Sequence, residues 1–106
     1  MTKEEILAME ADLDLDFQVD IKVMDGKGGY LACPAYSKDI SVAWLVVEKM
    51  QEQGLAKTFT LYWGKGWWCF FEYYDLAGNP IYATRGKTVP EAICKAALLT
   101  KLGGKK

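Results

Sequence analysis

The sequence predicts an α+β domain, an α/β/α sandwich in which helices cover both faces of a small, mainly antiparallel three-stranded sheet. Segments 39–53 and 89–102 repeat apolar residues at helical spacing, whereas the chain between them alternates as strands do. Segment 67–74 is apolar on both sides for most of its length, which is typical of a strand covered on both faces. A chain of 106 residues is long enough for one domain.

The first 24 residues predict two short elements. Thr2 and Glu5 fit a capping box, which starts a helix at about 3–9, so that residues 1–12 form a short helix and an acidic lead-in. Strict alternation favours a strand next: Leu13, Leu15, Phe17, Val19, Ile21 and Val23. Four residues also share one helical face: Leu13, Phe17, Ile21 and Met24. The pattern alone favours the strand.

Glycine and proline divide the rest of the chain. Residues 25–36 form a long Gly-rich loop. Ser37 or Asp39 caps the helix at 39–53, and Gly54 ends it. Strands follow at about 57–63, 67–74 and 80–85, the last two joined by a turn-rich hairpin connection. Thr88 and Glu91 form a second capping box before the helix at 89–102, and residues 103–106 are a flexible tail.

Residue types exclude several kinds of chemistry. The chain has no His, which removes the usual general base and the Ser-His and Cys-His pairs, so we do not expect an enzyme. Cys33, Cys69 and Cys94 are widely spaced and suit small buried residues better than a disulfide framework or a metal site. We expect no cofactor. One enzymatic alternative remains, in which carboxylates or a Cys33 nucleophile carry out the reaction.

Charge and hydropathy limit the partners. Seven acids lie in residues 1–20 and six bases in residues 85–106, yet the net charge is only −1. Duplex nucleic acid is not an expected partner, because such proteins usually carry a strong basic excess. Apolar stretches are too short for a membrane span, and the acidic start does not resemble a secretory signal. We therefore expect a cytoplasmic protein with no membrane partner.

Gly-Lys occurs in three predicted loops, at 26–27, 64–65 and 86–87. Glycine amides beside a lysine can hold a phosphate, and aromatic residues near strand ends can stack on a base. The third loop follows a strand and opens a helix, whose amino end favours anions. It is not a P-loop, and a plain hairpin end with a Thr88 cap explains it as well. The candidate ligand or partner residues are Lys27, Tyr30, Tyr36, Lys65, Trp67, Arg85 and Lys87.

Three segments together resemble a known family: VMDG at 23–26, PAYSKDISVAWLVVEKM at 34–50 and TVPEAICKAALL at 88–99. They are similar to the phage ABA sandwich domain family of small bacteriophage and prophage proteins. The resemblance implies helices on both faces of a sheet. It also implies a helix at 13–24, although Phe17 and Ile21 are more strand-like there than the family pattern. It supplies no agreed catalytic residue.

These observations lead to one main functional hypothesis. We expect a non-enzymatic phage accessory protein that binds a host component, either a host protein through the acidic first 20 residues or a small nucleotide-like ligand, with a homodimer as one arrangement. Such a protein would serve host takeover or act against a host defence. A single-stranded nucleic-acid-binding module is one alternative, disfavoured if helices cover the aromatic strand. A morphogenesis or regulatory protein is another.

Overall fold

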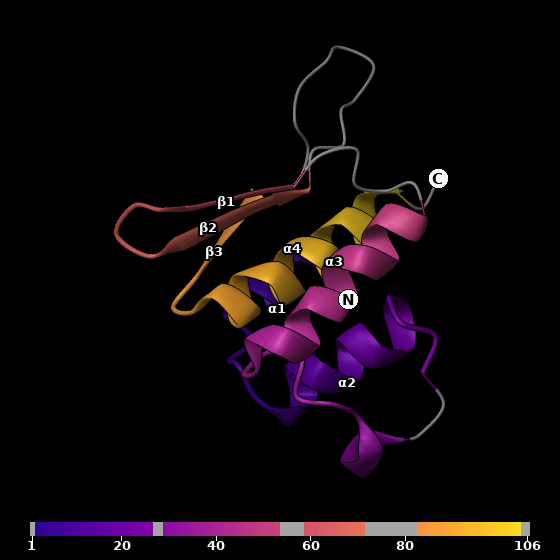
Figure 1. Ribbon diagram of the computed structural model, residues 1–106. Helices are drawn as coiled ribbons and strands as arrows, with labels where there is room; N and C mark the ends of the chain where they lie inside the picture. The colour runs from indigo at the N-terminus through magenta and orange to yellow at the C-terminus, as the bar shows by residue number, and fades with distance from the viewer. Residues whose placement is uncertain (1, 27–28, 54–58, 72–82, 105–106) are drawn as a thin grey trace.

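The computed structural model describes residues 2–26, 29–53, 59–71 and 83–104 (Figure 1). In chain order the elements are α1 Lys3–Ala8, α2 Leu13–Lys22, the 3-10 helix η1 Tyr30–Ala32, α3 Ile40–Glu52, β1 Phe59–Trp63, β2 Trp67–Phe71, β3 Ala83–Gly86 and α4 Val89–Gly104. This confirms the α+β class. Within the described ranges, no helix has the length and apolar character needed to cross a membrane.

The sheet has the strand order β1-β2-β3, and both neighbouring pairs are antiparallel, as predicted. The register places Trp68 of β2 between Tyr62 of β1 and Arg85 of β3, so these three side chains share one face. The predicted strand residues 57–58, 72–74 and 80–82 and the hairpin connection lie outside the described residues, as does Gly54.

Helix α4 is the centre of the core. Every residue from Pro90 to Thr100 is buried, because the helix contacts β2 and β3 on one side and α1, α2 and α3 on others. Even a polar residue fits there, since the Thr100 hydroxyl donates to the Ala96 carbonyl at 2.8 Å. The sequence indicated only a stripe of inner residues for this helix. A helix that is packed on all sides is mostly apolar all round, and the two buried charges of this one, Glu91 and Lys95, form an ion pair.

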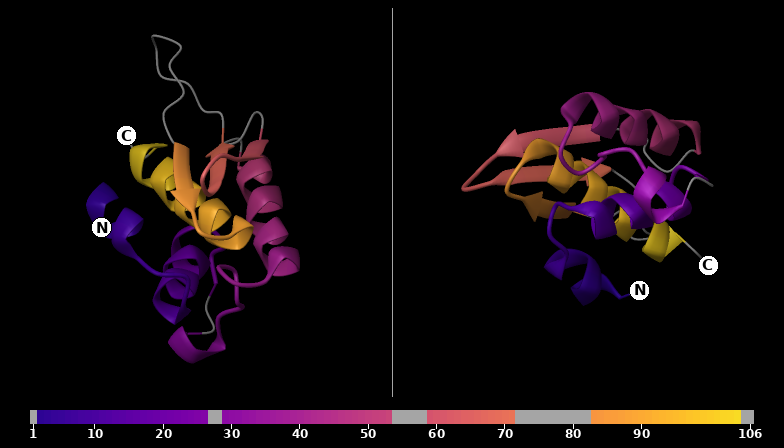
Figure 2. Two further views of the ribbon diagram at one scale, coloured as in Figure 1. Left: turned by 90° about the vertical axis from the view of Figure 1, so that its left-hand side faces the viewer. Right: turned by 90° about the horizontal axis from the view of Figure 1, so that it is seen from below.

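Of the predicted sandwich, the described residues show the sheet and the helices on one of its faces. In the part of the chain that the structure describes, the helices lie on one side of the sheet, as Figures 1 and 2 show, and only α4 makes extensive contact with it. The other face carries Tyr62 and Arg85, which are exposed, and Trp68, which is half-buried. Aromatic residues with a polar end do not need full burial, which fits the partial exposure of Tyr62 and Trp68 on this face.

Residues 13–22 form helix α2. This confirms the helix that the family pattern implied, and the strand that alternation favoured is not formed. The buried positions Leu15, Asp16, Val19 and Asp20 recur at helical spacing. Three of the alternating residues do not belong to the core: Leu13 and Phe17 are half-buried and Ile21 is exposed. The core therefore takes every second residue of the alternating set, Leu15, Val19 and Val23, which lie four apart on one helical face.

The helix ends match the sequence in part. Thr2 and Glu5 make the predicted capping box of α1. Asp39 caps α3 by accepting from the Ser41 amide at 2.9 Å, whereas Ser37 is buried and does not cap it. Helix α4 continues through Gly103 and Gly104, two residues past its predicted end, because glycine disfavours a helix without forbidding it.

Candidate functional site

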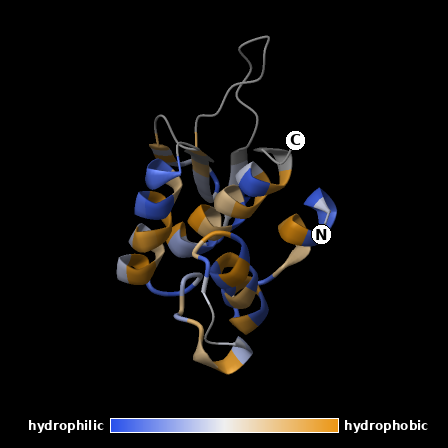
Figure 3. Cartoon of the chain, turned by 90° about the vertical axis from the view of Figure 1, so that its right-hand side faces the viewer, coloured by the Kyte–Doolittle hydropathy of each residue, from blue (hydrophilic) through white to orange (hydrophobic). Residues whose placement is uncertain are grey.

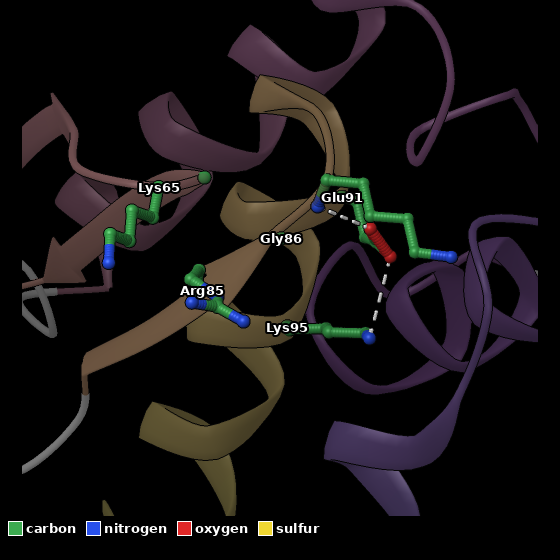
Figure 4. A pocket seen from close by; sticks show the side chains of 7 residues that line it. Lys65, Arg85, Gly86, Glu91 and Lys95 are labelled. Atoms are coloured by element: carbon green, nitrogen blue, oxygen red, sulfur yellow. Dashed lines mark hydrogen bonds and ion pairs between the residues drawn. The ribbon is translucent and has the colours of Figure 1, made fainter.

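A cationic pocket lies where the β1–β2 turn, the end of β3 and the start of α4 meet (Figure 4). Its volume is about 230 Å³. The lining residues are Lys65, Gly66, Arg85, Gly86, Lys87, Glu91 and Lys95. Four of these side chains are cationic and one is acidic, so the pocket has a net positive charge.

Local backbone geometry brings these residues together. Lys65 lies in the turn with a φ of 56°, in the left-handed region, and the Gly64 amide donates to the Gly66 carbonyl at 2.8 Å. Gly86 allows β3 to end directly against α4, because a Cβ there would lie 2.6 Å from the Ala92 nitrogen. The two segments therefore place their cations around one cavity.

Glu91 is already neutralised inside the site. Its carboxylate accepts from the Lys87 amide at 2.8 Å and lies 3.5 Å from the Lys95 ammonium. Lys95 also donates to the Leu7 carbonyl at 3.1 Å, and both Glu91 and Lys95 are buried. The predicted capping box is thus altered: Thr88 accepts from the Glu91 amide at 3.4 Å, but Glu91 reaches Lys87 and not Thr88.

Three cationic side chains of the pocket are available to bind an anionic ligand. Within the described ranges, the side chains of Lys65, Arg85 and Lys87 form no ion pair, and all three residues are exposed. Because Glu91 already occupies the amino end of α4, an anion in this pocket would be held by side chains more than by helix amides. A second cavity of about 410 Å³ adjoins it between α1 and α4 and shares Lys87, Glu91 and Lys95.

A row of planar groups crosses the open face of the sheet beside this pocket. The rings of Tyr62 and Trp68 are nearly parallel, at 9°, with centroids 6.2 Å apart. The Arg85 guanidinium carbon lies 5.9 Å from the Trp68 ring centroid on the next strand. The Trp68 indole N–H donates to the Gly64 carbonyl at 2.9 Å, which fixes the ring. Arg85 belongs to both this row and the pocket.

The structure separates the remaining predicted site residues. Trp67 lies on the helix-facing side of the sheet. Its ring meets that of Trp63 edge-on, with the ring centroids 5.5 Å apart. Tyr30 donates to the Asp14 carboxylate, and Tyr36 donates to the buried Asp20 carboxylate at 2.8 Å. Lys27 lies outside the described residues. The pocket therefore unites Lys65, Arg85 and Lys87 and none of the other predicted residues that the structure describes.

The acidic amino-terminal segment is largely committed to internal hydrogen bonds. Five of its seven acids have hydrogen-bond partners within the chain: Glu5, Asp12, Asp14, Asp16 and Asp20. The hydrogen bond to Asp14 is the main cause that raises the pKa of Tyr30 to about 12. The pKa of Tyr36 is raised as well, mainly by burial and secondly by the hydrogen bond to Asp20.

Cys33 lacks the environment of an activated nucleophile. Desolvation raises the pKa of its thiol, and the charges of Asp16 and Asp20 raise it further. The sulfur donates to the Tyr30 carbonyl at 3.2 Å. A reactive thiol needs the opposite, a lowered pKa near positive charge. Across the described residues, no three Cys, Asp or Glu side chains gather as metal ligands.

Sequence reasoning missed Tyr62, Trp68 and Lys95 as site residues. Lys95 follows Glu91 by four residues on a predicted helix, a spacing that places both on one face. Tyr62 alternates with Thr60 on the more polar side of its strand, which indicates that this side of the sheet is open to solvent. These two signals were present in the sequence.

The fold and site together define a small α+β domain with a cationic pocket next to an open aromatic row. The chain belongs to the phage ABA sandwich domain family, whose model matches residues 4–98. This confirms the resemblance drawn from three segments of the sequence. Neither a curated protein nor a solved structure matches the chain.

Proposed function

We propose that this protein is a non-enzymatic phage accessory protein that captures a phosphate-bearing, nucleotide-like ligand of the host. The observation that carries the proposal is that Lys65, Arg85 and Lys87 all line one pocket and form no ion pair among the described residues. Capture would remove a host nucleotide signal from its receptor in the host cytoplasm, which is an anti-defence role.

The pocket suits a phosphate group in charge and in geometry. A guanidinium presents paired donors that match phosphate oxygens, and lysine adds mobile point charges. The pocket's one carboxylate, Glu91, is paired with Lys95 and therefore offers little repulsion to an anion. Binding without chemistry is supported by the Cys33 environment, since that thiol is the one nucleophile that the sequence suggested.

Native mass spectrometry of the purified protein is the first test, because it reports both a retained ligand and the oligomeric state. Thermal unfolding with added ATP and cyclic dinucleotides is the second. A ligand at about a hundredfold excess over its Kd should raise the Tm by roughly 10 °C for a domain of this size. The proposal is wrong if no nucleotide or inorganic polyphosphate shifts the Tm.

A matched pair of charge reversals locates the site. Lys87→Glu should abolish the ligand-induced shift, whereas Lys38→Glu changes the net charge equally at an exposed position away from the pocket and should keep it. Equal loss in both variants would show that overall charge and not the pocket attracts the ligand.

A host protein is the second candidate partner. Its support is helix α3, where Ile40, Trp44 and Leu45 are each about half exposed, at 51%, 49% and 49%. Figure 3 shows this helix with apolar residues in its first turns and hydrophilic residues at its end. Trp44→Glu should abolish capture of a host protein, or dissociate a homodimer in size-exclusion chromatography, without changing nucleotide binding.

A further inference from the structure

We propose that Trp68 is a positioning residue of the cationic pocket: its ring holds the Arg85 guanidinium in place for the phosphate group of a ligand. This inference rests on the proposed function and deepens it, because it states how the pocket recognises a phosphate. Arg85 is the only arginine in the sequence, and the other cations that line the pocket are lysines (Figure 4). It therefore supplies the one planar fork of donors that can meet two phosphate oxygens at once.

The Trp68 ring lies between residues of the two neighbouring strands. The register places Tyr62 of β1 on one side of it and Arg85 of β3 on the other. The Tyr62 ring is nearly parallel to the indole, at 9°, with the centroids 6.2 Å apart. The Arg85 guanidinium carbon lies 5.9 Å from the indole centroid, within the range of a cation–π interaction. Because the indole N–H also donates to the Gly64 carbonyl at 2.9 Å, the chain itself fixes the ring that supports Arg85.

The stem of Arg85 is confined by a second contact, with Gly66 in the β1–β2 turn. A Cβ on Gly66 would lie 2.9 Å from the Cδ of Arg85 and 3.1 Å from its Cγ, so a residue without a side chain leaves room for the stem. The φ of Gly66, 137°, also favours glycine. Arg85 is therefore exposed to solvent, yet the chain contacts both its stem and its guanidinium.

Order in the free protein matters for affinity because an arginine side chain has many rotamers. A side chain that becomes immobile only when the ligand binds loses conformational entropy, and this loss opposes binding. A guanidinium over a ring keeps its N–H donors at the edge of its plane, where they can still meet a phosphate. An Arg85 that Trp68 already holds should therefore bind a phosphate more tightly than a freely rotating arginine would.

The first test needs no ligand. Because the chain has a single arginine, one side-chain N–H signal in the NMR spectrum reports the Nε of Arg85, and its relaxation gives an order parameter. Trp68→Leu should lower this order parameter toward the values below about 0.6 that mark flexible groups. Trp63→Leu is the matched control and should leave it unchanged, because Trp63 is on the same hairpin but on the opposite face and is 64% exposed. An unchanged order parameter in Trp68→Leu would overturn the proposal.

The second test measures the affinity for inorganic triphosphate by calorimetry at one fixed ionic strength. Trp68→Leu should weaken binding about three- to tenfold, the effect expected when one long side chain must be ordered by the ligand. Trp68→Phe keeps a ring but loses the indole N–H, so its affinity should lie between those of the wild type and Trp68→Leu. Arg85→Ala should weaken binding about tenfold or more, because charge-assisted hydrogen bonds to the phosphate are lost.

A double-mutant cycle separates positioning from folding. In the Arg85→Ala background, Trp68→Leu should not lower the triphosphate affinity further, because its effect acts through the guanidinium. Equal weakening by Trp68→Leu in both backgrounds would mean that Trp68 acts on the pocket through the fold, and the proposal would be refuted.

The outcomes also separate this inference from the proposed function. If the wild-type protein binds neither triphosphate nor ATP, capture of a phosphate-bearing ligand fails, and the role of Trp68 in binding fails with it. If triphosphate binds and Trp68→Leu leaves its affinity unchanged, the proposed function stands and the positioning role alone is wrong.

Discussion

The acidic and basic regions of this protein use charge in opposite ways. Around α2 and η1, carboxylates accept hydrogen bonds from the chain itself: Asp16 from the Ser37 amide at 2.7 Å and Asp20 from Tyr36. Around β3 and the start of α4, three cations are exposed beside a cavity and form no ion pair with any described residue. Charge excess in a sequence therefore indicates a binding surface only where the charges are not already paired.

The comparison has a consequence for mutagenesis. Because the acidic region uses its charges to hold loop 29–39 on α2, changes there should lower the free energy of unfolding. Changes of exposed cations in the basic region should instead lower ligand affinity and leave stability nearly unchanged.

The largest effect is expected from Gly26→Ala in the acidic region. A Cβ at this position would lie 2.0 Å from the Asp20 carboxylate, which is buried and held by Tyr36. The carboxylate would have to move and lose its bond, so we expect a loss of about 3 kcal/mol, measured by urea unfolding. Gly29→Ala is the control: its Cβ meets no atom, and only a φ of +82° opposes it, at about 1 kcal/mol. Equal losses would contradict this contact.

A smaller loss is expected from Asp20→Ala. The substitution leaves the buried Tyr36 hydroxyl without its acceptor, which should reduce the free energy of unfolding by about 1–3 kcal/mol. Asp14→Ala removes a comparable bond to Tyr30 at an exposed site and should have a smaller effect. Chemical denaturation of both variants checks the order, and the reverse order would show that burial does not decide the strength of these bonds.

Alkaline pH should weaken the same region. The folded pKa of Tyr30 is raised to about 12 from an ordinary value of 10.0, so the folded state keeps a proton that the unfolded state releases between these values. The contribution to stability is therefore complete below pH 10 and is lost as the pH rises toward 12. Ultraviolet titration of tyrosinate should show one fewer late-ionising tyrosine in Tyr30→Phe than in the native protein, with the late ionisation of Tyr36 retained in both. An unchanged titration in Tyr30→Phe would assign the late step to another tyrosine.

The smallest effect on stability is expected in the basic region. Lys87→Glu should change the free energy of unfolding by no more than about 0.5 kcal/mol, because the side chain is exposed and its backbone bond to Glu91 is kept. Urea unfolding checks this value. A large loss would mean that Lys87 is a structural residue, and the contrast between the two regions would no longer hold.

The sequence predicted the positions of the helices better than the way in which they cover the sheet. Period and capping located α1, α3 and α4 because those patterns depend on residues close in the chain. Helix α2 needed the family pattern, since Leu15 and Val19 fit a strand and a helix equally well. The cover of the sheet was not predictable, because it depends on which side of β2 meets α4, and Trp67 and Trp68 are the same residue type.

The candidate site was predictable in part. Lys65, Arg85 and Lys87 were found because a Gly-Lys pair marks a turn, and both turns lie beside neighbouring strands. Lys95 and the Tyr62–Trp68 row were missed because they depend on cross-strand register and on the ion pair with Glu91. Tyr30 and Tyr36 were included because no local pattern shows that their hydroxyls bond to carboxylates 16 positions earlier in the chain.

The burial of α4 on all sides also has a consequence for synthesis. This helix follows every other described element in the chain, yet the sheet and the three other helices all pack on it. A nascent chain therefore cannot close its core until residues 89–100 have left the ribosome, and its apolar surfaces stay open to chaperones and aggregation until then. Translation that stops before Val89 should yield a protease-sensitive product.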